Sequence, residues 1–307
     1  MVRGSGGSKK AIYAALFGNL GIAISKLIAA LFTGSISMWA ETYHSFSDAF
    51  NQVLLLVGIR TSKKQVSEKH PFGYGKEQFI WSFIVATLIF GISGVLSLEQ
   101  GIGSFMGNDF HRLDDLSINY IILAISFVFE ANALRIALGI FKNVIEDRAI
   151  NYQFQQLLKN LKSKDTSVLT VVVEDSAALL GIIIAFAALV LSDITKNNAF
   201  DALGSWLIGF MLMAFAFFLA RENKDLLIGE SMSKRDHQSI YKAVSQISKV
   251  NKIASIRTMY FAPENVLIAI EVSLVDYLDA GIIESVIDNI ESKIKAVIPY
   301  AVSSKIY

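Results

Sequence analysis

The sequence predicts an all-α transmembrane domain of six helices, followed by a small α+β domain. Two observations predict this class. The 307 residues are 53% hydrophobic and only 18% charged, whereas an ordinary soluble domain carries about 25% charged residues. The apolar residues also gather in blocks of about 18–25, which is long enough to cross about 30 Å of hydrocarbon. After Asn223 these blocks cease, and the pattern becomes that of a soluble domain.

The membrane domain is predicted to contain six spans. They cover residues 11–33, 37–58, 79–102, 118–141, 167–191 and 201–220. Lysine and arginine are concentrated in the connections between spans 2 and 3 and between spans 4 and 5. The other three connections hold only Arg112 and Lys196. Because basic residues accumulate on the cytoplasmic side, both termini are predicted to be cytoplasmic. A short amphipathic helix is expected at the membrane interface over residues 149–162.

Three parts are therefore expected along the chain. Residues 1–10 form a flexible cytoplasmic N-terminus, residues 11–222 the transmembrane domain and residues 223–307 a cytoplasmic α+β domain. In this last domain, apolar residues at helical spacing around 240–247 and over 280–297 predict two helices. Strands are predicted at 253–261 and 266–272 around a turn, with a final strand at 301–306. Docking or dimerisation would help to stabilise so small a domain.

Composition also excludes several classes of partner. The chain has no cysteine, which excludes disulfides and thiolate metal ligands. A net charge of +1 gives no indication of nucleic acid as a partner. We find no Walker-type phosphate loop and no His-Glu-x-x-His motif, so neither ATP hydrolysis nor a membrane-embedded metal hydrolase is expected. The chain is predicted not to be an enzyme.

Span 2 carries the densest group of polar residues within a predicted span. They are Glu41, His44, Asp48 and Gln52, and their spacings of three, four and four place them on one helical face. Ionisable residues at membrane depth are costly and are functional candidates by default. His44 and Asp48 can present an imidazole nitrogen and a carboxylate oxygen to the same ion, and zinc accepts both ligand types.

A second helix must supply the remaining ligands, and span 5 contains the adjacent carboxylates Glu174 and Asp175. The alternative is that these polar groups only join neighbouring helices. Lys26 and Arg135 are the basic residues within the spans that could pair with them. Several anions at membrane depth need a cation to offset their desolvation, which favours a metal site.

Three separated motifs resemble the cation diffusion facilitator family. They read GSISM at 34–38, AETYHSFSD at 40–48 and HPFGYGKE at 70–77. Within that family the chain looks most like the zinc transporter 9-like branch. The features that suggest the branch are RTSKK at 60–64, EDSAA at 174–178 and a carboxylate at Glu130.

The resemblance implies a homodimeric metal/proton antiporter with six spans and a cytoplasmic ferredoxin-like domain. It places metal ligands at His44, Asp48 and Asp175. Where the family has another His or Asp in span 5, this chain has Val171, and Glu174 is the expected substitute. An alternative is that Glu174 faces another helix and water completes the site.

Other polar residues receive weaker assignments. Glu41 and Glu130 are expected to act as proton relays or in a structural role. His70 matches a loop metal site of some family members, but Tyr74 replaces a second histidine there. His237 is expected to be exposed and solvated. Asp201, at the start of span 6, is expected to cap a helix.

The sequence thus predicts a multi-pass membrane protein that exports a divalent metal, with zinc favoured, in exchange for protons. Metal and proton would compete for His44, because imidazole, with a pKa of about 6.5, must be neutral to bind metal. Two alternatives remain: a manganese or iron exporter of the same fold, and a non-transporting partner subunit that has lost a ligand. The membrane is expected to be a bacterial inner membrane or that of an organelle.

Overall fold

The structure of this chain is a computed structural model that describes residues 5–107, 116–146, 166–262 and 265–298. The chain divides into two compact units. The first holds residues 1–58, 80–150 and 167–223, and the second holds residues 59–79, 151–166 and 224–307. The predicted amphipathic helix at 149–162 and the predicted final strand at 301–306 lie outside the described residues.

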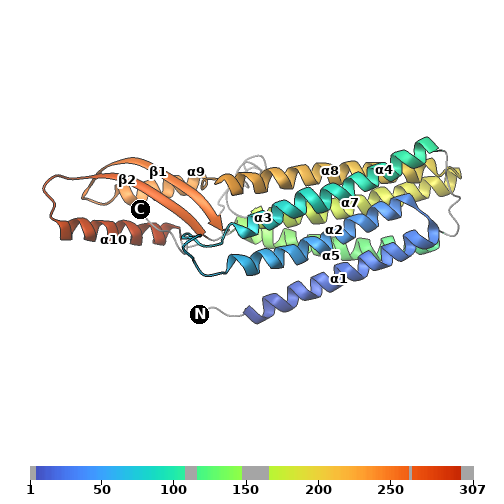
Figure 1. The fold of residues 1–307 in the computed structure, drawn as a ribbon, viewed down its shortest axis with the longest axis horizontal. Coiled ribbons are helices and arrows are strands. Elements are labelled where there is room, and N and C mark those ends of the chain that lie inside the picture. Colours follow the sequence, from blue (N-terminus) through green and yellow to red (C-terminus); the bar gives the residue numbers. More distant parts are fainter. Residues whose placement is uncertain (1–4, 108–115, 147–165, 263–264, 299–307) are drawn as a thin grey trace. The chain divides into compact units, whose positions relative to one another are not determined.

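The first unit is built from long helices (Figure 1). Their bounds are α1 Ser5–Thr33, α2 Ile36–Ser62, α4 Gly91–Gly107, α5 Ser117–Glu146, α7 Thr166–Thr195 and α8 Ala199–Ile228. The helix α3 (Glu77–Ile84) leads directly into α4 through the π-helical turn η1 (Val85–Phe90). The predicted third span is therefore one helical run with a wider turn near its middle.

Five helices of the described residues are long and apolar enough to cross a membrane. Their apolar segments are Leu16–Thr33, Glu77–Met106, Ser117–Gly139, Glu174–Thr195 and Ala199–Ile228. The remaining predicted span, span 2 at 37–58, is also helical, as α2. It is not among the five, because Glu41, His44, Asp48 and several serines lower its hydropathy. The last helix, α8, runs eight residues beyond the predicted end at Ala220.

Small residues bring the helices of this unit close together. α4 and α8 meet through glycines: a Cβ on Gly101 would come within 2.8 Å of the Ala202 carbonyl oxygen, and one on Gly209 within 2.9 Å of the Gly94 carbonyl oxygen. Helices that approach this closely need residues without side chains at the contact. The two helices are therefore fixed against each other along one face of α4.

The second unit contains two helices and a two-stranded sheet within its described residues (Figure 1). The elements are α9 Lys234–Ser245, β1 Val250–Ala262, β2 Asn265–Leu274 and α10 Ala280–Val297. The strands are antiparallel, with Ile256 opposite Ile270 and Tyr260 opposite Val266. Apolar side chains of both helices and both strands share one core, which includes Ile240, Ile268 and Ile294. The predicted order α-β-β-α is found as far as residue 298.

Candidate functional site

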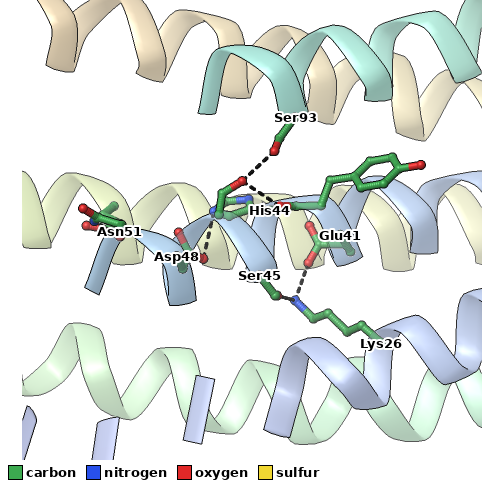
Figure 2. A network of polar contacts seen from close by, with 10 residues as sticks. Lys26, Glu41, His44, Ser45, Asp48, Asn51 and Ser93 are labelled. Carbon is green, nitrogen blue, oxygen red and sulfur yellow. Dashed lines mark hydrogen bonds and ion pairs between the residues drawn. The ribbon is translucent and has the colours of Figure 1, made fainter. Parts of the chain in front are cut away.

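The polar face of α2 lies inside the helical unit. His44 and Asp48 are only 1% and 6% exposed. They occupy successive turns, and Figure 2 shows their side chains pointing toward one another. The His44 Nε2 atom lies 3.4 Å from Asp48 Oδ2, without the geometry of a hydrogen bond. The one-turn spacing thus places an imidazole and a carboxylate together, away from solvent.

Several polar side-chain atoms on this face are buried without a hydrogen-bond partner. In the described part of the chain these atoms include Glu41 Oε1, both ring nitrogens of His44, Asp48 Oδ1 and Gln52 Oε1. Buried polar atoms in folded proteins are normally hydrogen-bonded, so each exception needs a physical reason. A row of such atoms on one helical turn after another has the chemistry to receive a cation or protons.

Glu41 forms an ion pair with Lys26 of α1. The Lys26 ammonium lies 2.7 Å from Glu41 Oε2 and also donates a hydrogen bond to Ser45 Oγ at 2.8 Å (Figure 2). On the other side, a Cβ on Gly181 of α7 would collide with the Glu41 carboxylate. Glu41 therefore joins α2 to α1 and packs against α7.

Glu174 of α7 reaches α2 through Asn51. The Asn51 side-chain amide donates a hydrogen bond of 2.8 Å to Glu174 Oε1. The carboxyl group of Glu174 also interacts electrostatically with Asp48. Lys26 and Arg135 were the partners expected if Glu174 served only to join helices. Instead, Lys26 pairs with Glu41, and the side chain of Arg135 is exposed.

Asp175 and Glu130 add negative charge to the same region. Asp175 is half-buried on α7, and Glu130 is half-buried on α5. The two carboxyl groups interact electrostatically, and Glu130 also acts on Asp48. Carboxylates from α2, α5 and α7 thus act on one another within the helical unit. A cation near these carboxyl groups would offset their mutual repulsion.

The predicted ligand set is not closed around a single point. Among the described residues, no three His, Cys, Asp or Glu side chains meet in an arrangement that could hold a metal ion. The structure brings His44 and Asp48 together. Glu174 interacts electrostatically with Asp48. Asp175 instead interacts electrostatically with Glu130 and Glu174. The side chain of Val171, at the position of the missing family ligand, lies outside the described residues.

Asn51 was missed by the sequence reasoning, although a signal was present. It follows His44 by seven residues and Asp48 by three, so it falls on the same face of α2. The adjacent Gln52 was selected instead. Gln52 is half-buried, and its Oε1 has no hydrogen-bond partner. The hydrogen bond from Asn51 to Glu174 depends on how α2 and α7 pack together. The sequence alone does not determine that packing.

Asp201 caps a helix, as the sequence predicts, whereas His237 differs from expectation. Asp201 lies in the first turn of α8 but caps a different helix. It accepts hydrogen bonds from the backbone N–H groups of Ile36 (2.6 Å) and Ser37 (3.2 Å) at the start of α2, and also from the hydroxyls of Ser35 and Ser37. His237 is half-buried rather than solvated, with Nε2 3.3 Å from Thr258 Oγ1.

His70 is exposed in the segment between α2 and α3. Its ring lies against Tyr74, with 4.5 Å between the ring centroids. The Tyr74 hydroxyl in turn lies 3.1 Å from Ser67 Oγ. His70 thus packs against the residue that replaces the second histidine of the family's loop site.

Comparison with known proteins gives the family context. A family model described as the cation efflux transmembrane domain matches residues 12–228. The mitochondrial proton-coupled zinc antiporter SLC30A9 of Xenopus laevis is 33% identical over 232 residues, which are 76% of this chain and 40% of the relative. The human protein of the same name is 32% identical over the same shares. Metal tolerance protein C4 of Arabidopsis thaliana is 27% identical over 83% of this chain and 55% of its own length. The chain thus spans about half or less of the length of these relatives.

Proposed function

Because this chain belongs to the cation efflux family, we propose that it exports a divalent metal ion, with zinc favoured, in exchange for protons. Membership in a transporter family confirms that the chain is not an enzyme, and it confirms the family resemblance carried by the three sequence motifs. Zinc and proton coupling are carried over from the names of relatives that are about one third identical.

One observation carries the proposal within this chain. His44 and Asp48 lie one turn apart and are buried, and three of their polar side-chain atoms have no hydrogen-bond partner. Nitrogen and carboxylate oxygen are ligands that zinc accepts when thiolate is absent. The same atoms can hold protons when the metal has left. Metal and protons would then compete for them, which is the physical basis of exchange.

We assign the rest of the metal site to α7. Asp175 is the family position, and Glu174 is the proposed substitute at the turn where Val171 offers no donor atom. The hydrogen bond from Asn51 to Glu174 and the electrostatic interaction of Glu174 with Asp48 support this substitution. Because the ligands do not meet at one point in the structure, metal binding in this proposal draws α2 and α7 closer together. The energy for that movement comes from neutralising the buried carboxylates.

The wider architecture is proposed on the family resemblance. α2 would be a sixth span that neighbouring helices shield from lipid, and its polar face would line the metal path. Residues 1–10 would be a cytoplasmic N-terminus, residues 11–222 the transport domain and residues 223–307 a cytoplasmic ferredoxin-like domain that supports a homodimer. Both termini would be cytoplasmic, in a bacterial inner membrane or an organelle membrane.

Two alternative functions are kept beside zinc export: export of manganese or iron, and a non-transporting partner subunit. The set of one imidazole and up to three carboxylates is harder than a site with two imidazoles, and so it suits manganese or iron better than a typical zinc site does. A non-transporting partner subunit would keep the fold while lacking a ligand at Val171.

The proposal is tested with the purified full chain in liposomes. Proton flux across the liposome membrane is measured while zinc, manganese, iron and cobalt are added in turn. Zinc-dependent proton flux against the direction of zinc movement is the expected result. Flux with manganese or iron but not zinc would change the substrate, and no flux with any metal would favour the partner-subunit reading.

A further inference from the structure

Asn51 is a buried amide on the polar face of α2 that has no place in the proposed set of metal ligands. It is only 6% exposed and lies about one turn beyond Asp48 on the same face (Figure 2). Its side-chain amide donates a hydrogen bond of 2.8 Å to Glu174 Oε1 of α7. An amide carries no charge and does not titrate, so it can orient a carboxylate without neutralising it.

The face of α7 that meets α2 carries Glu174 and Gly181. Glu174 contacts α2 at Asn51, and a Cβ on Gly181 would collide with the Glu41 carboxylate. Seven residues are about two helical turns, so Glu174 and Gly181 share one face of α7. Asp175 follows Glu174 by one residue and is therefore rotated by about 100° from that face. The packing of α7 thus turns Glu174 toward the polar face of α2.

Glu174 also acts on a second carboxylate of that face, the one of Asp48. The two carboxyl groups interact electrostatically. Like charges away from water repel one another unless a hydrogen-bond donor or a cation offsets the repulsion. The Asn51 amide is such a donor, because its N–H bond places positive partial charge on Glu174 Oε1. It therefore helps to hold the Glu174 carboxylate toward α2 when no metal is bound.

A glutamate needs this kind of support if it is to bind a metal. Its side chain has several rotatable bonds and loses conformational entropy when it is fixed on an ion. A neighbour that orients the side chain beforehand removes part of that cost. Carboxylates that bind metals are accordingly held by hydrogen bonds from surrounding groups. The hydrogen bond from Asn51 gives Glu174 a partner of this type.

We propose that Asn51 is a positioning residue of the metal site, whose amide orients the Glu174 carboxylate so that its other oxygen, Oε2, can bind the metal together with Asp48. The inference rests on the proposed transport function and on the assignment of Glu174 to the site. Asn51 does not bind the ion itself. Its effect on metal affinity therefore passes through Glu174.

The first test is the zinc affinity of Asn51→Leu, measured by titration calorimetry on the purified full-length chain in detergent. This variant removes the amide donor, while Glu174 keeps its charge. We expect zinc affinity to fall by about 10–100-fold, as for other partners that orient metal ligands. Asn51→Ala removes the same donor without adding volume and should give the same result. Thermal unfolding shows that each variant is folded.

Asn119→Leu is the matched control, because it also removes a buried amide that joins two helices. The Asn119 amide of α5 donates a hydrogen bond of 3.0 Å to Thr33 Oγ1 of α1, and neither residue is a predicted ligand. This variant should lower the melting temperature and leave zinc affinity unchanged. A loss of affinity in Asn51→Leu then reflects its contact with Glu174 rather than weaker helix packing.

The second test combines Asn51→Leu with Glu174→Gln. Two residues that act through one contact give non-additive effects, whereas independent residues give additive ones. In the Glu174→Gln background, Asn51→Leu should change zinc affinity by no more than about twofold, which is the usual error of additivity. If Asn51 bound the metal directly, or acted only on general stability, the loss would be the same in both backgrounds.

The outcomes separate this inference from the proposed function. An unmodified chain that does not bind zinc, or Glu174→Gln with unchanged affinity, would contradict the proposed site itself. If Glu174→Gln weakens binding, full zinc affinity in Asn51→Leu and Asn51→Ala would overturn the positioning role alone. An equal loss in the two backgrounds would also overturn it. A large loss in the unmodified background and almost none beside Glu174→Gln is the result that the proposal predicts.

Discussion

Lys26 on α1 and Glu41 on α2 form an ion pair of 2.7 Å in which both side chains are almost completely shielded from solvent. Glu41 lies one turn from His44, and Ser45, the second acceptor for Lys26, directly follows His44. The pair therefore fixes the polar face of α2 relative to α1. The Lys26 ammonium also acts electrostatically on Asp48 and Glu130, so it lies within reach of several carboxyl groups of the unit.

Removing Lys26 should destabilise the folded protein strongly. Lys26→Met leaves the Glu41 carboxylate buried and uncompensated, and loss of one partner of a buried pair costs about 3–5 kcal/mol. Thermal unfolding in detergent measures the change. The control is Lys196→Met, which breaks an exposed pair with Asp193 and should cost less than about 1 kcal/mol. An unchanged melting temperature for Lys26→Met would contradict the assigned role.

The Asp201 cap should stabilise the start of α2. Asp201→Ala leaves the N–H groups of Ile36 and Ser37 and two serine hydroxyls without their acceptor. We expect a loss of stability of about 1–3 kcal/mol. The exposed Asp193→Ala on α7 is the matched control. Equal melting temperatures for the two variants would show that the carboxylate does not hold α2 in place.

Glu174 should contribute to metal affinity through its charge. In Glu174→Gln the side-chain oxygen can still accept the hydrogen bond from Asn51, so the helix contact is retained while the anion is lost. Metal affinity should fall by about 10–100-fold, with the melting temperature of the metal-free protein near that of the unmodified chain. Titration calorimetry and thermal unfolding on one preparation measure both quantities.

The opposite pattern would remove Glu174 from the proposed site. A lowered melting temperature with unchanged metal affinity would make Glu174 a structural partner of Asn51 alone. Glu99→Gln on α4, an exposed carboxylate, controls for the general effect of losing one negative charge. Its metal affinity should match that of the unmodified protein.

Much of the helical architecture follows from the sequence, because each apolar block is long enough to decide its own structure. The five apolar spans and the α-β-β-α order up to residue 298 are found within the described chain. The polar face of α2 was also predictable, since three- and four-residue spacings fix which side chains share a face.

Interactions between helices were not predictable in the same way. Lys26 was recognised as an available cation, but the sequence did not indicate that Glu41 would be its partner. Asp201 was expected to cap a helix, and the helix it caps is α2, more than 160 positions away in the chain. The hydrogen bond from Asn51 to Glu174 forms only because α7 packs beside α2. In each case the partner depends on packing between segments that are distant in sequence.

Transport by variants of His44 and Asp48 tests the central claim most directly. The measurement is zinc-dependent proton flux in liposomes containing Asp48→Asn or His44→Ala, with thermal unfolding as the check that each variant is folded. The account predicts that either folded variant loses zinc transport, because each removes one of the two ligands that α2 presents. Folded Asp48→Asn and His44→Ala that move zinc at the unmodified rate would contradict it.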